Sequence, residues 1–170
     1  MKIVSPDDAR GLILSGKAPS RMHVGGWLSL EGCASLKTLP EGLHVGGWLD
    51  LFGCTSLKTL PEGLHVERSL DLRGCTSLKS LPEGLHVEGN LNLYGCTSLK
   101  SLPEGLHVGG DLHLNGCASL KSLPYSIHVE ETLYCNPELI EKIPYEDLPL
   151  YMGLKWYYQE VFNRRLEEAL

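Results

Sequence analysis

The sequence has few of the features that mark membrane proteins, secreted proteins or nucleic-acid-binding proteins. No apolar run approaches the ~18 residues that a membrane span needs. The first residues carry Pro6, Asp7 and Asp8 before any apolar stretch, which is not the pattern of a secretory signal. Acidic residues outnumber basic residues by 21 to 15, and the net charge of -6 argues against a nucleic-acid surface. We therefore expect no membrane and no nucleic acid as partner.

Leucine and glycine, by contrast, are abundant, and an internal repeat accounts for both. The 170 residues include 33 leucines and 19 glycines, whereas aromatic residues make up only 7%. The phrase LPEGLHV recurs unchanged in four copies of a unit that is 21 residues long. Self-similarity at a fixed period of about 20 to 50 residues is the signature of a solenoid.

Each copy predicts one short strand followed by an irregular return. The pattern V-x-x-x-L-x-L-x-G-C alternates apolar and polar residues, as a strand does, and the remainder, SLKTLPEG, contains a Pro and a Gly that exclude a full helix. Such units stack as parallel strands ~4.8 Å apart. The paired strand leucines are Leu28/Leu30, Leu49/Leu51, Leu70/Leu72, Leu91/Leu93 and Leu112/Leu114, with Leu133/Cys135 as a degenerate sixth pair.

The segment L49-D-L51-F-G-C54-T-S-L57 and its copies resemble the leucine-rich repeat family, whose core is L-x-x-L-x-L-x-x-N/C-x-L. The short repeat with its LP step is similar to bacterial members, and GCTSLKSLPEGL also resembles repeats of plant immune receptors. The resemblance implies an α/β solenoid: a horseshoe or right-handed coil with a parallel sheet on the concave face, an irregular convex side and helical caps at both ends. Members of the family mostly bind other proteins.

The two ends of the chain predict helical caps, which solenoids need for solubility. We divide the chain into an N-terminal capping helix over 1–17, the repeats over 18–140 and a C-terminal helical cap over 141–170. A helix is expected over 6–15 after the N-cap Ser5, a short one over 137–142 and a longer one over 150–170. An alternative is that the last helix binds a partner or a second copy through Trp156, Tyr157 and Phe162.

The cysteines and histidines recur in register, and we expect structural roles for both. Side chains repeated every ~4.8 Å lie beyond the usual disulfide range, and no C-x-x-C pair suggests zinc. The cysteine ladder comprises Cys33, Cys54, Cys75, Cys96 and Cys117, and the histidine ladder comprises His23, His44, His65, His86, His107 and His128. Because no carboxylate accompanies the histidines in every copy, we expect no metal and no cofactor. Free thiols indicate a reducing, cytoplasmic location, with export by a specialised route left open.

The positions at which the copies differ predict the functional surface. Variation gathers at the outward strand positions, and large exposed aromatic residues there match the chemistry of binding hot spots. The residues expected to bind a partner on the concave face are Trp27, Trp48, Asp50, Phe52, Asp71, Arg73, Asn92, Tyr94, His113 and Tyr134. Relaxed drift of solvent positions is the alternative explanation.

The sequence favours a non-catalytic module that binds an unidentified protein partner through this face, as a monomer or weak homo-oligomer. A non-catalytic bacterial effector acting on a host or rival-cell protein is one alternative, and a homo-oligomer through the C-terminal helix is another. Catalysis by Asp50, Asp71 and His113 is not expected, because a shallow face offers no pocket and the sequence shows no nucleophile motif or phosphate loop.

Overall fold

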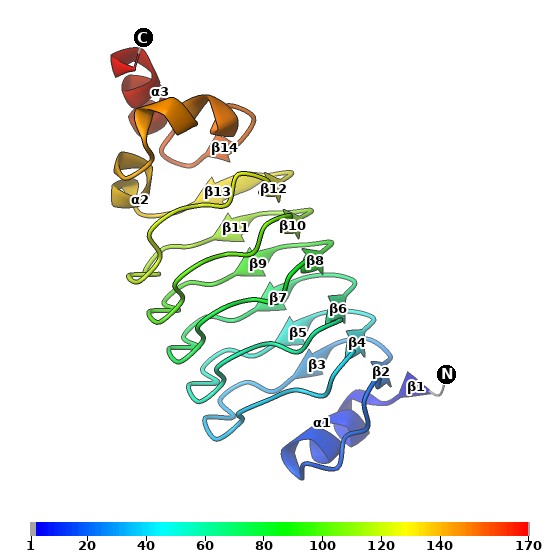
Figure 1. The fold of residues 1–170 in the computed structure, drawn as a ribbon. Helices are drawn as coiled ribbons and strands as arrows, with labels where there is room; N and C mark the ends of the chain where they lie inside the picture. Colours follow the sequence, from blue (N-terminus) through cyan, green and yellow to red (C-terminus); the bar gives the residue numbers. More distant parts are fainter. Residues whose placement is uncertain (1–2, 170) are drawn as a thin grey trace.

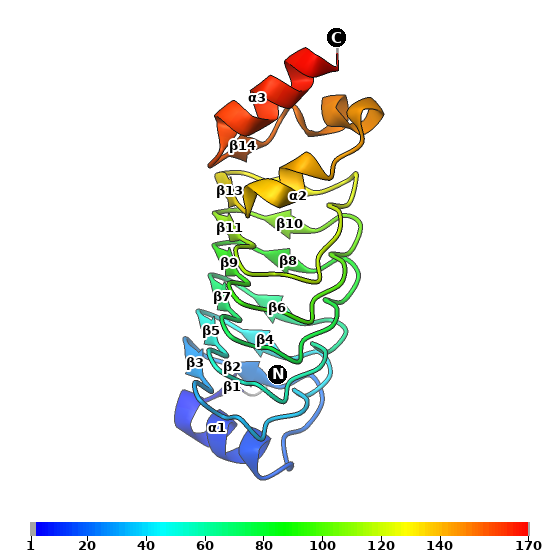
Figure 2. The ribbon, with the colours of Figure 1, turned by 90° about the vertical axis from the view of Figure 1, so that its left-hand side faces the viewer.

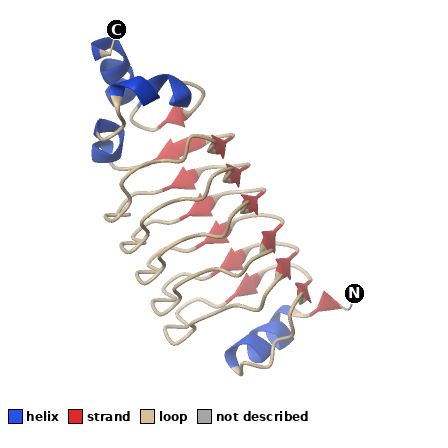
Figure 3. Cartoon of the chain, in the orientation of Figure 1, coloured by secondary structure: helices blue, strands red, loops and turns tan. Residues whose placement is uncertain are grey.

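Each 21-residue copy forms one turn of a coil, and the turns stack to build two parallel sheets of seven strands each (Figure 1; Figure 3). The computed structural model describes residues 3–169. The first sheet, here the histidine sheet, comprises β1 (Ile3–Val4), β2 (His23–Val24), β4 (His44–Val45), β6 (His65–Val66), β8 (His86–Val87), β10 (His107–Val108) and β12 (His128–Val129). The second, here the leucine sheet, comprises β3 (Leu28–Ser29), β5 (Leu49–Asp50), β7 (Leu70–Asp71), β9 (Leu91–Asn92), β11 (Leu112–His113), β13 (Thr132–Tyr134) and β14 (Lys155–Trp156).

The prediction of one continuous strand per copy is wrong, because the chain bends between the two sheets. In the second coil the bend lies over 46–48. The N–H of Gly46 donates to Val24 in the preceding coil, whereas the N–H of Leu49 donates to Ser69 in the following coil. A period-2 pattern that continues across a bend looks like one strand in the sequence, but the two halves serve different sheets.

The core is a stack of identical apolar layers, as the 21-residue period predicts. Strands pair with a register of one repeat, so that Val45 lies beside Val66 and Leu49 beside Leu70. Val45, Leu49, Leu51 and Leu57 have no exposed surface. Each coil therefore buries its apolar residues against the equivalent residues of its neighbours, which is the usual source of stability in a solenoid.

The N-terminal segment closes the first coil with a helix and an extra strand. Helix α1 (Pro6–Leu14) begins as predicted after Ser5, whose hydroxyl accepts the N–H of Asp8 at 3.3 Å. The guanidinium of Arg10 donates to the carbonyl of Ser29 on β3, the edge strand of the leucine sheet, at 2.5 Å. Strand β1, which was not predicted, pairs with β2 and extends the histidine sheet.

The C-terminal segment contains more than the predicted pair of helices, and Figure 2 shows it stacked on the last coil. Helix α2 (Pro137–Glu141) lies where it was expected. The single helix predicted over 150–170 is wrong: the chain forms the 3-10 helix η1 (Tyr145–Tyr151), then β14, and only then α3 (Gln159–Glu168). Strand β14 pairs with β13, whose outer edge would otherwise be unpaired. Leu170 lies outside the described residues.

Two aromatic residues that suggested a partner-binding helix belong to the chain's own core. Trp156 and Phe162 are only 4% and 2% exposed, and their rings stack with centroids 5.1 Å apart. These two residues are therefore not available to a partner, and the interpretation that they form part of a partner-binding helix is wrong. Tyr157, the third residue of the set, is 58% exposed.

The close stacking at the bend predicts that Gly47 cannot be replaced by alanine without loss of stability. A Cβ at this position would lie 2.7 Å from the carbonyl carbon of Gly26, which is backbone and cannot move aside alone. We expect Gly47→Ala to lower the free energy of unfolding by about 1 to 3 kcal/mol, measured by urea denaturation. Gly11→Ala is the control, because a Cβ in α1 meets nothing within 4 Å and alanine favours a helix. Equal stability of the two variants would contradict the packing at the bend.

Candidate functional site

The outward face of the leucine sheet carries the residues that the sequence predicts as a binding surface. We call it the leucine-sheet face. Asp50, Asp71, Asn92, His113 and Tyr134 lie side by side on five consecutive strands, β5 to β13, because a register of 21 residues aligns them. The structure places Asp50 next to Asp71, whereas β9 separates Asp71 from His113.

Trp27 and Trp48 directly precede β3 and β5, and Phe52, Arg73 and Tyr94 follow the strands by two residues. All ten predicted residues therefore lie along this one sheet, as their repeat positions require.

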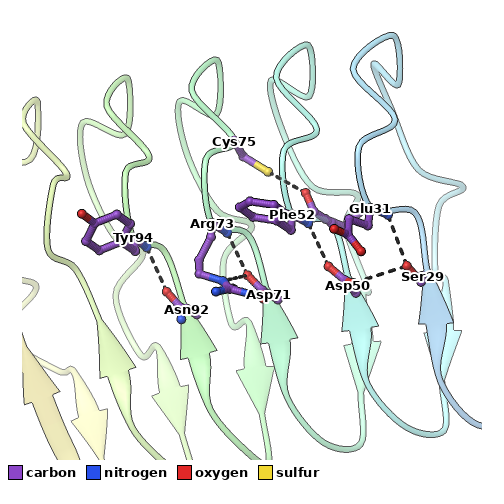
Figure 4. Close-up of polar contacts among 10 residues, drawn as sticks. Ser29, Glu31, Asp50, Phe52, Asp71, Arg73, Cys75, Asn92 and Tyr94 are labelled. Atoms are coloured by element: carbon purple, nitrogen blue, oxygen red, sulfur yellow. Dashed lines mark hydrogen bonds and ion pairs between the residues drawn. The ribbon is translucent and has the colours of Figure 1, made fainter.

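One column of side chains on this face accepts hydrogen bonds from the backbone just after each strand ends. The carboxylates of Asp50 and Asp71 accept the backbone N–H two residues ahead, from Phe52 and Arg73, each at 3.0 Å (Figure 4). The amide oxygen of Asn92 accepts the N–H of Tyr94 in the same way at 3.1 Å. Asp and Asn commonly form such local turns. The need to accept these backbone hydrogen bonds therefore restricts which residues can occupy the column. Comparing the copies in sequence does not show this restriction.

A second column ties neighbouring coils together at the bend. The hydroxyl of Ser69 accepts the N–H of Asn90 at 3.1 Å, and the side-chain oxygen of Asn90 accepts the N–H of Asp111 at 2.9 Å. The carboxylate of Asp111 then accepts the N–H of Thr132 at 3.0 Å. From the third coil onward this column is a chain of side-chain-to-backbone hydrogen bonds, so its polar residues also have structural roles.

The two tryptophans at the start of the same column differ from these polar residues. Trp27 is 65% exposed and Trp48 is 57% exposed. They stand at one side of an open groove of about 490 Å³ that is also lined by Asp71 and Asn92. Indole side chains that are exposed to this extent carry an unfavourable apolar surface in water.

Arg73 and Phe52 form a second feature beside the groove. The guanidinium of Arg73 lies 5.0 Å from the centre of the Phe52 ring and 2.7 Å from the carboxylate of Asp71. Figure 4 shows these side chains on neighbouring coils, with Tyr94 one coil further on. Arginine and aromatic side chains that are held in place by neighbours lose little entropy when a ligand binds.

The far end of the face continues as a row of neighbouring aromatic rings. The rings of His113 and Tyr134 are stacked with centroids 4.4 Å apart, and Tyr157 lies 4.9 Å beyond Tyr134. Tyr157 follows β14, so the added strand extends the face by one position. Tyr157 was not predicted on this face, because the sequence pattern of this segment indicated a helix.

Four of the five cysteines in the cysteine ladder are buried and donate to a backbone carbonyl. The thiol of Cys75 donates to the carbonyl of Leu51 in the preceding coil at 3.2 Å, and Cys54, Cys96 and Cys117 make the equivalent bonds. All six cysteines are free thiols. Burial raises the pKa of Cys54 and Cys117 to about 11 and that of Cys75 and Cys135 to about 12, and it also raises the pKa of Cys96. Cys33, in contrast, is partly exposed beside Arg10.

The histidine ladder lies on the other sheet, and its rings contact one another in two groups of three. In the first group, the ring centroid of His44 lies 4.0 Å from that of His23 and 4.5 Å from that of His65. In the second group, the ring centroid of His107 lies 4.2 Å from that of His86 and 4.7 Å from that of His128. The pKa of His107 is lowered, chiefly by partial burial and then by its two histidine neighbours.

Each group also has one carboxylate. Nε2 of His44 lies 2.8 Å from Glu67, and Nε2 of His107 lies 3.4 Å from Glu130. The hydrogen bond from His44 lowers the pKa of Glu67.

The different environments of the cysteines predict that only one thiol of the native protein reacts readily. We expect Ellman's reagent to modify Cys33 first, because the other five are buried and their raised pKa values leave little thiolate at neutral pH. Cys33→Ser is expected to abolish the fast phase, and unfolding in guanidinium chloride is expected to expose the remaining five thiols. Several fast thiols in the folded Cys33→Ser protein would show that the ladder is not buried.

The column that contains Trp48 and Asp111 has hydrogen-bonded polar residues at one end and exposed tryptophans at the other. Substitutions at the two ends are therefore expected to affect stability differently. Asp111→Ala leaves the N–H of Thr132 without its acceptor, and we expect the free energy of unfolding to fall by about 1 kcal/mol. Trp48→Ala removes an exposed side chain and is expected to change it by less than about 0.5 kcal/mol. Urea denaturation of both variants checks this. A larger loss from Trp48→Ala would mean that the indole stabilises the fold.

Comparisons with known proteins identify no relative of this chain. No protein-family model matches it, and no curated protein and no solved structure shows a significant match. Among the described residues, no helix is long and apolar enough to cross a membrane.

Proposed function

We propose that this chain is a non-catalytic leucine-rich repeat protein that binds a protein partner through the leucine-sheet face. The strand leucines and the inward cysteines occupy the L-x-L and N/C positions of that family's pattern. Helix α1 at one end, and α2, η1 and α3 at the other, act as caps in this proposal. The partner contacts the variable residues between them.

The observation that carries the proposal is the pair of exposed tryptophans. Ser69, Asn90 and Asp111 hold neighbouring coils together, but Trp27 and Trp48 occupy the same column and stand exposed. Tryptophan is among the residues most enriched in binding hot spots. A partner that covers both indoles would remove a large apolar area from water, and this supports binding at the N-terminal half of the face.

The size of the face indicates how much of it a partner must use. The leucine sheet has seven strands, and, with the residues that flank each strand, about five residues per coil project an area of roughly 500 Å². A standard interface buries about 800 Å² on each partner. We therefore propose that the contact extends from the tryptophans past Phe52 and Arg73 towards the aromatic row at His113, Tyr134 and Tyr157. The locally bonded Asp50 and Asp71 orient the surface in this proposal and do not act as acid and base.

A binding comparison between matched variants tests this function. We expect the double variant Trp27→Ala/Trp48→Ala to lose at least tenfold in affinity for a partner captured by the wild-type protein, measured by calorimetry with the purified partner. The control is Leu150→Ala/Met152→Ala, which removes two exposed apolar side chains outside the face. We expect this control to bind as tightly as the wild type.

Two outcomes would contradict binding at the leucine-sheet face. If the tryptophan variant binds the partner with wild-type affinity, the leucine-sheet face is not the binding surface. If the Leu150→Ala/Met152→Ala variant alone loses affinity, the partner binds at the C-terminal helices instead.

A further inference from the structure

The histidine sheet contains two clusters in which two imidazoles and one carboxylate meet. In the first, the ligand atoms of His23, His44 and Glu67 all lie within 4.8 Å of one another. In the second, the same holds for His107, His128 and Glu130. Each cluster belongs to a different one of the two groups of histidines.

The same register rule brings the glutamate of each cluster to one of its two histidines. The position two residues after each ladder histidine is Gly or Glu: it is Gly25, Gly46, Glu67, Glu88, Gly109 and Glu130 in successive coils. A Glu carboxylate reaches the histidine of the preceding coil where that coil has Gly at this position. Glu67 reaches back over Gly46, with its carboxylate oxygen 3.7 Å from where a Cβ of that residue would lie.

Only two steps along the chain go from Gly to Glu in this column, and each has a cluster. Glu130 follows Gly109, and its carboxylate lies 3.4 Å from His107. Glu88 follows Glu67 instead of a glycine, and it belongs to neither cluster. No metal was expected from the sequence because a carboxylate does not recur in every copy, whereas these two clusters require a carboxylate in only two copies.

We propose that each cluster binds one divalent transition-metal ion of the Zn²⁺ type through its two histidines and its glutamate. Two imidazole nitrogens with one carboxylate oxygen form a ligand set that suits Zn²⁺ and leaves the fourth position to water. The ligand side chains are partly exposed, so an ion and its water enter from solvent without opening the core. The glutamate compensates one of the two charges of the ion.

Binding requires a small rearrangement of side chains. Ligand atoms in a tetrahedral zinc site lie about 3.3 Å apart, since each is ~2.0 to 2.1 Å from the ion. The imidazoles of His23 and His44 are stacked, so each ring must turn until its nitrogen faces the ion. Both side chains are partly exposed, so the rotation takes place outside the buried layer of valines.

The contact distances predict that the first cluster is the tighter site. Nε2 of His44 lies 2.8 Å from the carboxylate of Glu67, whereas Nε2 of His107 lies 3.4 Å from that of Glu130. Near the second cluster, the ammonium of Lys155 is paired with Glu131 and so adds little net charge. We therefore expect the site at His23, His44 and Glu67 to fill first.

The test is a metal titration of the untagged, full-length protein with the Cys33→Ser substitution, which removes the one partly exposed thiol. Zn²⁺ is titrated in competition with a colorimetric chelator, and Co²⁺ binding is followed by its visible absorption. We expect two ions per chain and a Co²⁺ spectrum without thiolate charge-transfer bands. Glu67→Gln is expected to weaken the tighter site at least tenfold, and Glu130→Gln the weaker site.

The matched control is Glu88→Gln, which changes the equivalent residue outside both clusters and is expected to leave both sites intact. Melting curves in EDTA check that every variant is folded. Absence of saturable binding would overturn the proposal, as would two full sites in the Glu67→Gln/Glu130→Gln variant. A single site that is lost in only one of the two variants would overturn the proposal for the other cluster.

Discussion

Backbone hydrogen bonding between coils, in a register of one repeat, is the interaction on which the rest of this structure depends. Each coil donates from its histidine segment to the coil before it, as from His65 to Leu43, and from its leucine segment to the coil after it, as from Leu70 to Asn90. Both neighbours are thereby held at a fixed spacing and without a shift. A slip of one residue would turn the buried leucines outward along the whole sheet.

This register forces equal residues into contact and so determines what each position can do. Cys54, Cys75, Cys96 and Cys117 are buried and donate to the same carbonyl of the preceding coil because the register repeats that carbonyl, and histidines stack for the same reason. Function arises where the copies differ. The tryptophans interrupt a column of hydrogen-bonding residues on the leucine sheet, and the change from Gly to Glu on the histidine sheet brings a carboxylate to a histidine.

The sequence was sufficient for the repeat and the helix that follows Ser5, because both rest on local patterns with a fixed period or a clear cap. It was not sufficient for the bend between the sheets, since the alternation of apolar residues continues through it. Strand β14 was missed because Trp156 gains its partner only from β13, more than twenty residues away. For the surface, the variable positions lie on one face as expected. The structural roles of Asp50 and Asn90 depend on backbone groups that comparing copies does not show.

Amide hydrogen exchange of the native protein measures the register between coils most directly. We expect the slowest amides to be those that join coils in the middle of the stack, at Leu49, Leu51, Leu70, Leu72, Leu91 and Leu93. We also expect these amides to exchange together, because the bonds of one coil hold its neighbours. Rapid exchange at these leucines, or slow exchange confined to the terminal helices, would contradict this register.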